Sequence, residues 1–121
     1  MTASSKSSRL DIPVTTDAIG LYELIDQLHN RIPKKNRYTI WKSVSDTTLA
    51  LLSQITKTRY LPSEQKRSAL TACIAQVDTL RLLIRICYTI QALSAKDHSD
   101  LQQKIDTIGR MLGGWVKVTK R

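Results

Sequence analysis

The feature that most restricts the fold is a regular repeat of apolar residues in the second half of the chain. Between residues 70 and 87 they recur in steps of 3, 4, 3, 4 and 3, at Leu70, Cys73, Val77, Leu80, Ile84 and Cys87. These steps place the side chains in one seam along a helix, which then packs nearly parallel or antiparallel to its neighbours. Pro62 fits the first turn of this helix. We therefore predict a long helix from about residue 62 to about residue 93.

Three further segments have helical periodicity: about residues 16–31, about residues 38–58, and a last one from Ser99 onward. Thr16 or Thr15 fits the N-cap of the first segment. Ser99-Asp100-Leu101-Gln102 has the capping-box pattern for the last segment, because a serine is followed three residues later by glutamine. No convincing strand emerges. The chain is therefore expected to be all-α with four helices.

The connectors between the predicted helices are short, at residues 32–37, 59–62 and 94–98. Short connectors favour antiparallel neighbours and hence an up-down-up-down four-helix bundle. The length fits one domain, which we place at residues 15–121 after a flexible serine-rich tail at residues 1–14. No segment reaches the roughly 18 consecutive apolar residues of a membrane span, so no membrane partner is expected.

Charge is distributed unevenly along the chain. Residues 1–33 carry three Lys or Arg against four Asp or Glu, whereas residues 34–121 carry 16 against 6. An excess of this size on a small helical domain favours binding to a polyanion, with nucleic acid as the leading candidate. A basic surface without any nucleic-acid role is the alternative.

The cations fall into three groups. One lies at the start of the second helix, with Lys34, Lys35, Arg37 and Lys42; a second is Arg81 and Arg85; a third is Lys117, Lys120 and Arg121. Arg81 and Arg85 are four residues apart, so one helix face presents both, to phosphate or to a partner carboxylate. Alternatively, both snorkel at the edge of the bundle. Tyr38 and Trp41 are either base-stacking residues or anchors in the core or at an interface.

Nothing in the sequence predicts a catalytic or cofactor site. His29 and His98 lack metal-ligand spacing with Cys, Asp or Glu, and the glycines form no phosphate-binding loop. Cys73 and Cys87 lie about 21 Å apart along one helix at ~1.5 Å per residue, too far for a disulfide. We expect buried, reduced thiols, which suit the cytoplasm. The predicted class is a non-enzymatic protein without cofactor or metal.

The C-terminal segment Gly109-Arg110-Met111-Leu112-Gly113-Gly114-Trp115-Val116 is unusual, because each glycine inside a helix costs roughly 1 kcal/mol relative to alanine. Gly109 and Gly113 share a helix face and permit close approach of another helix; the alternative is fraying from Gly113 onward. On this segment, on Leu80-Arg81-Leu82-Leu83-Ile84-Arg85 and on Ile32-Pro33-Lys34-Lys35, the chain resembles the accessory variability determinant proteins of diversity-generating retroelements. These are related to the ribosomal-RNA intervening-sequence proteins, and the resemblance covers about residues 20–119.

The resemblance implies a homopentameric barrel of four-helix bundles with no catalytic site. It implies binding to the retroelement reverse transcriptase, to template RNA and to cDNA or other DNA, in support of mutagenic cDNA synthesis and homing. Carried onto this chain, Lys34, Lys35, Arg81, Arg85 and Arg110 would form the nucleic-acid and transcriptase surface. Gly109, Gly113 and Trp115 would pack at a subunit interface.

Two alternatives remain open. One is a structural or interaction bundle of the intervening-sequence branch with general nucleic-acid binding. The other is a small helical ribonuclease, which is weakened because no histidine follows Arg81, Arg85 or Arg110 at short spacing.

Overall fold

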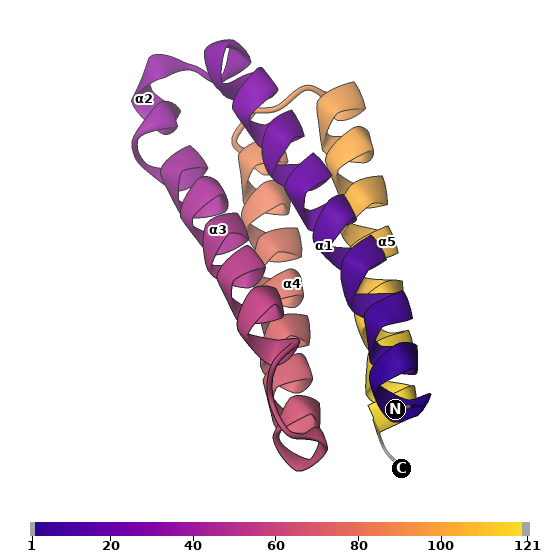
Figure 1. Cartoon of the computed structure of the whole chain (residues 1–121). Coiled ribbons are helices and arrows are strands. Elements are labelled where there is room, and N and C mark those ends of the chain that lie inside the picture. Colours follow the sequence, from indigo (N-terminus) through magenta and orange to yellow (C-terminus); the bar gives the residue numbers. More distant parts are fainter. Residues whose placement is uncertain (1, 120–121) are drawn as a thin grey trace.

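A computed structural model describes the backbone of residues 2–119 and the side chains of residues 11–119. Four long helices run up, down, up and down (Figure 1), which confirms the predicted all-α four-helix bundle. They are α1 (Thr2–Leu28), α3 (Ile40–Thr58), α4 (Ser63–Thr89) and α5 (Ala95–Thr119). A 3-10 turn, η1 (His29–Arg31), and a four-residue helix, α2 (Lys34–Arg37), connect α1 to α3.

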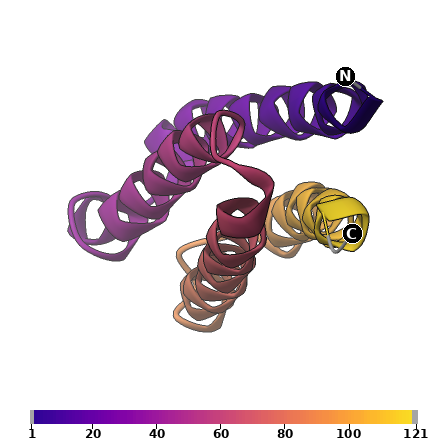
Figure 2. The same ribbon diagram turned by 60° about the horizontal axis from the view of Figure 1, so that its bottom comes forward.

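The four long helices lie around a common core, which Figure 2 shows obliquely from the end where the chain starts. Helices α1 and α4 each pack against both α3 and α5, so α1 and α4 occupy opposite corners. The predicted seam of α4 is the inner face of that helix, and all six of its residues are at most 1 % exposed. Trp41 and Trp115 are the largest of the fully buried side chains. Burial of this apolar surface is the main stabilising term of the fold.

The predicted start of the first helix at Thr16 is wrong, and so is the boundary between a tail at 1–14 and a domain from residue 15. Helix α1 runs through this point, and its residues Asp11 and Val14 are buried. The hydroxyl of Thr16 donates to the carbonyl of Ile12 at 3.1 Å, as in a helix interior, and caps nothing. An ion pair fixes the early part of α1, because Nε of Arg59 donates to Asp11 Oδ2 at 3.1 Å.

The predicted start of the last helix at Ser99 is also wrong. Helix α5 begins at Ala95, and the hydroxyl of Ser94 accepts a hydrogen bond from the backbone N–H of Asp97 at 3.1 Å. Ser94 is therefore the N-cap. The buried carboxylate of Asp97 accepts two hydrogen bonds from Nη1 of Arg31, at 2.9 and 3.0 Å. This pair joins η1, the turn that follows α1, to the start of α5.

Helix α4 ends at Thr89, short of the predicted residue 93, because Gln91 adopts a φ of 65°. The backbone N–H groups of Ala92 and Leu93 both donate to the carbonyl of Cys87, at 2.8 and 3.2 Å. A left-handed residue after the last turn closes a helix in this way, although glycine usually occupies that position. Helix α5, in contrast, continues through Gly113 to Thr119, so the alternative of fraying from Gly113 is excluded.

Candidate nucleic-acid interface

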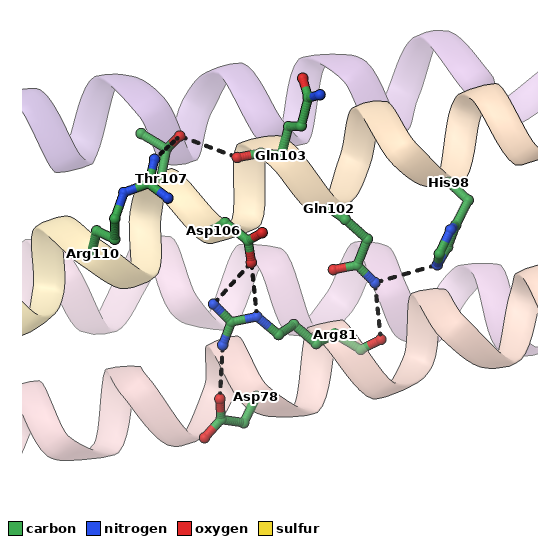
Figure 3. A network of polar contacts seen from close by, with 8 residues as sticks. All are labelled: Asp78, Arg81, His98, Gln102, Gln103, Asp106, Thr107 and Arg110. Atoms are coloured by element: carbon green, nitrogen blue, oxygen red, sulfur yellow. Dashed lines mark hydrogen bonds and ion pairs between the residues drawn. The ribbon is translucent and has the colours of Figure 1, made fainter.

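Arg81 is held by two carboxylates and is not a free phosphate ligand. Its Nη1 donates to Oδ1 of Asp78 at 2.9 Å on the same helix, and its Nη2 lies 3.1 Å from Oδ1 of Asp106 on α5. Figure 3 shows the guanidinium between the two acids. The side chain is 38 % exposed, so each ion pair contributes little to stability on its own. Its local role is to join α4 to α5.

Arg85 is placed differently, although it lies one turn further along α4. Its side chain is exposed and makes no hydrogen bond or ion pair with the side chains that the structure describes. Arg81 and Arg85 therefore differ in their surroundings, although both were predicted to lie on one face of the helix. Only Arg85 presents an uncompensated positive charge.

The basic group around the start of α3 also contains both cations with a partner and cations without one. Lys34 and Lys35 lie in α2, exposed and without an ion pair among residues 11–119. Arg37 instead donates to the backbone carbonyl oxygens of Ile32 at 2.8 Å and Asn30 at 3.1 Å, and so supports the turn. Lys42 is exposed, and its Nζ lies 2.7 Å from Oδ2 of Asp46. Lys34 and Lys35 are therefore the available cations of this group.

The two aromatic residues of this region have different surroundings. Trp41 is 1 % exposed and belongs to the core, so the core anchor is the alternative that holds for this residue. Tyr38 is 72 % exposed and meets the ring of His29 edge-on, with the ring centres 6.1 Å apart. Of the two, Tyr38 alone offers a ring to a partner.

Helix α5 carries the remaining predicted cations. Arg110 is exposed, and its Nη2 lies 3.4 Å from the hydroxyl of Thr107 (Figure 3). Lys117 is exposed and has no ion pair among residues 11–119. Lys120 and Arg121 lie outside the described residues. The basic residues are thus spread from α2 at one end of the bundle to the last turn of α5 at the other (Figure 1), and they form no single pocket.

The residues predicted to pack at a subunit interface mostly serve the interior of the subunit. Trp115 has no exposed surface, which corrects its placement at an interface. A Cβ built on Gly109 would meet Nη2 of Arg81 at 2.9 Å, so this glycine makes room for the arginine within the chain. Nothing lies within 4 Å of a Cβ built on Gly113. Gly113 is therefore the one residue of the three that still faces open space.

Neither cysteine has the character of a reactive thiol. Cys73 and Cys87 are buried and unpaired, as predicted. Burial raises the pKa of each thiol to about 11, although a hydrogen bond with Thr58 lowers that of Cys73 slightly. The thiolate, which is the nucleophilic form, is thereby disfavoured. Their contribution is to packing in the α4 seam.

Two polar arrangements had no recognisable signal in the sequence. The ring of His98 stacks on Tyr88 with the centres 4.6 Å apart, and Nε2 of His98 lies 3.4 Å from Nε2 of Gln102. A shallow hollow of about 370 Å³ lies between α1 and α5, lined by Leu24, Asp100, Gln103, Lys104 and Thr107. Within the described residues no cluster of three or more His, Cys, Asp or Glu side chains is placed to hold a metal ion.

Arg81 and Asp106, which meet between α4 and α5, are 25 residues apart in the sequence. Sequence spacing identified Asp78 as a neighbour of Arg81, but nothing in it identified Asp106.

Comparison with known proteins adds one result. A family model described as bAvd-like matches residues 18–119, which is most of the chain. Searches of curated proteins and of solved structures gave no match. In the described part of the chain, none of the helices combines the length and the apolar character needed to cross a membrane.

Proposed function

The chain belongs to the bAvd-like family, and from this membership we propose a non-enzymatic accessory role in a diversity-generating retroelement. In this role the protein binds the retroelement reverse transcriptase together with template RNA and cDNA, and supports mutagenic cDNA synthesis and homing. The family is an accessory, non-catalytic one in general. The protein acts in the cytoplasm as a homo-oligomer. The resemblance to the accessory variability determinant proteins implies that this oligomer is a pentamer.

The observation that carries the nucleic-acid part of this proposal is the number of exposed cations without a carboxylate partner. Of the predicted cations, four meet this description on α2 and α5: Lys34, Lys35, Arg110 and Lys117. A cation that has no internal partner gains most from a phosphate, because counterions are then released from the nucleic acid. We therefore propose that the polyanion binds to these four residues.

The cations held by partners of their own have a smaller share in this surface. Arg37 is bound to two backbone carbonyls, Lys42 to Asp46, and Arg81 to two carboxylates. Moving any of them to a phosphate breaks an existing interaction. Arg85 is free, but it lies at the margin of an exposed apolar face of α4.

The test is a titration of labelled template RNA with the protein over a salt series. The double variant Lys34→Glu/Lys35→Glu is compared with Lys57→Glu/Lys104→Glu, which has the same change of charge at exposed positions outside the proposed surface. We expect the first variant to bind at least ~10-fold more weakly and to lower the slope of log K against log salt by about 1.4, since each phosphate contact contributes roughly 0.7 for single strands. Equal losses in both variants would mean that net charge alone drives binding.

The transcriptase part is tested separately, by capture of the cognate reverse transcriptase on the tagged protein with and without RNA. Capture in the absence of RNA supports a direct protein contact. Failure of capture under both conditions would leave a nucleic-acid-binding bundle of the intervening-sequence type. The same RNA samples, run on a gel, show whether the labelled RNA stays intact, and cleavage would overturn the non-enzymatic role.

A further inference from the structure

The outer face of α4 is unusually apolar for an exposed helix surface. Its central residues, which we call the α4 stripe, are Ala75, Thr79, Leu82 and Ile86; Leu82 is 58 % exposed and Ile86 is 37 % exposed. From residue 68 to residue 90 the helix carries three charged side chains. Two of them, Asp78 and Arg81, pair with each other. A helix of a monomeric protein normally presents charged residues on this side.

A second exposed stripe lies on α1 and has a different character. Ile12, Ile19, Glu23 and Asp26 follow one another in steps of 7, 4 and 3, which places them on one helix face. We call this set the α1 stripe. Ile12 is 56 % exposed and Ile19 is 46 % exposed. Glu23 and Asp26 are exposed and have no ion pair among residues 11–119.

The two stripes are complementary in both apolar character and charge. On α4 the unpaired Arg85 follows Leu82 by three residues, and on α1 the unpaired Glu23 follows Ile19 by four. These spacings correspond to about 4.5 and 6 Å along a helix axis. When the helices lie parallel with Ile19 against Leu82, Glu23 therefore comes beside Arg85.

One copy cannot join its own stripes. Helices α1 and α4 occupy opposite corners of the bundle (Figure 2). The residues of both stripes are exposed, on the sides of these helices that do not face the core. A contact between them therefore needs two copies, and each copy retains one unused stripe for the next. Such a heterologous contact repeats, and it closes into a ring when the rotation between copies allows.

We propose that the α1 stripe of one copy docks on the α4 stripe of the next copy of this chain. The proposal rests on the self-association given above as part of the proposed function, and it assigns the surfaces that make it. Apolar burial of Ile12, Ile19, Leu82 and Ile86 drives the contact, and the pair of Glu23 with Arg85 fixes its register.

The first test measures the mass of the full-length protein by sedimentation velocity and light scattering over a concentration series. Leu82→Glu places a charge in the α4 stripe, and Ile19→Glu does the same in the α1 stripe. Tyr60→Glu is the matched control, because Tyr60 is 79 % exposed in the turn between α3 and α4, outside both stripes. We expect both stripe variants to dissociate to monomers with unchanged helical circular dichroism, and the control to assemble like the wild type.

The second test exchanges the two charges. Glu23→Arg and Arg85→Glu should each weaken self-association by about tenfold or more, since each places like charges together. The double variant should return to within about threefold of the wild type, because opposite charges face each other again. Lys57→Glu, an exposed and unpaired residue of α3, is the control for the loss of a positive charge.

The outcomes separate this inference from the proposed function. An oligomer that survives both Leu82→Glu and Ile19→Glu would overturn the surface assignment and leave the accessory role intact. A wild-type protein that stays monomeric at all concentrations would overturn self-association, while RNA and transcriptase binding are still judged by their own assays. If Leu82→Glu keeps the oligomer but loses transcriptase capture, the α4 stripe binds the transcriptase and the inference is wrong.

Discussion

The guanidinium of Arg81 lies directly over Gly109, where a Cβ would come within 2.9 Å of Nη2. Because position 109 has no side chain, Arg81 passes over α5 and reaches Asp106 while it also binds Asp78. The glycine therefore makes room for a charged side chain and not for the backbone of a second helix. Two glycines that look equivalent in sequence, Gly109 and Gly113, thus have different surroundings.

This difference predicts unequal gains in stability for two alanine substitutions. Gly113→Ala should raise the free energy of unfolding by about 0.5–1 kcal/mol, because alanine is the better helix former and the space is open. Gly109→Ala should gain less, since Arg81 must move and its exposed ion pairs are worth ~1 kcal/mol or less. Urea unfolding followed by circular dichroism measures both. A loss at Gly113 would indicate that another molecule covers this surface.

The end of α4 predicts a stabilising substitution. Gln91 has a φ of 65°, which costs a residue with a side chain roughly 1–2 kcal/mol but costs glycine almost nothing. Gln91→Gly should therefore raise the free energy of unfolding by about 1 kcal/mol. Ala50→Gly, at an exposed interior position of α3, should lower it by about the same amount. If both variants lose stability, Gln91 contributes through contacts of its side chain.

The pair of Arg31 with Asp97 predicts an unequal response of two ion pairs. Asp97 has an 8 % exposed side chain, so Arg31→Ala leaves a buried carboxylate without its partner and should cost about 1–3 kcal/mol. Lys42→Ala removes a pair whose partners are both about 60 % exposed, and should cost under ~0.5 kcal/mol. Thermal and urea unfolding of both variants measure this contrast. Similar losses would show that burial of Asp97 is unimportant.

The cysteines predict a stability change at alkaline pH. In the folded protein the pKa of each thiol is about 11, against an ordinary value of 9.0. At a pH between these two pKa values, the thiols are deprotonated in the unfolded chain but still protonated in the folded protein. The free energy of unfolding therefore falls as pH rises from about 9 to about 11. Cys73→Ala/Cys87→Ala should show a shallower decline over this range. Rapid labelling of the native protein by a thiol reagent at pH 8 would contradict the burial of these groups.

The sequence predicted the bundle well where one helix face decides the structure. The seam from Leu70 to Cys87 is buried along its whole length, because a strict repeat of apolar residues has few alternative ways to be covered. Helix ends were predicted less well, since contacts distant in the chain select among equivalent local signals. Ser94 and Ser99 both fit an N-cap, but Asp97 binds Arg31, 66 positions away, when the helix starts after Ser94.

In the candidate nucleic-acid interface, too, contacts between residues distant in the chain decided what the sequence could not predict. Net charge predicted which half of the chain is basic, but it did not predict which cations already have a partner. Arg81 and Arg85 are one turn apart in α4, yet only Arg81 meets a carboxylate from α5. That distinction depends on how two helices are rotated against each other, and short-range spacing carries no information about this rotation.

The even number of antiparallel helices has a practical consequence. Helix α1 starts and α5 finishes at one end of the bundle, while Lys34 and Lys35 lie in α2 at the opposite end (Figure 1). A fluorophore, an affinity handle or a surface linker attached through either terminus would thus be separated from the lysine pair by the length of the bundle. Immobilised in this orientation, the protein would present α2 to nucleic acid in solution, which makes single-molecule recording of binding and release practicable.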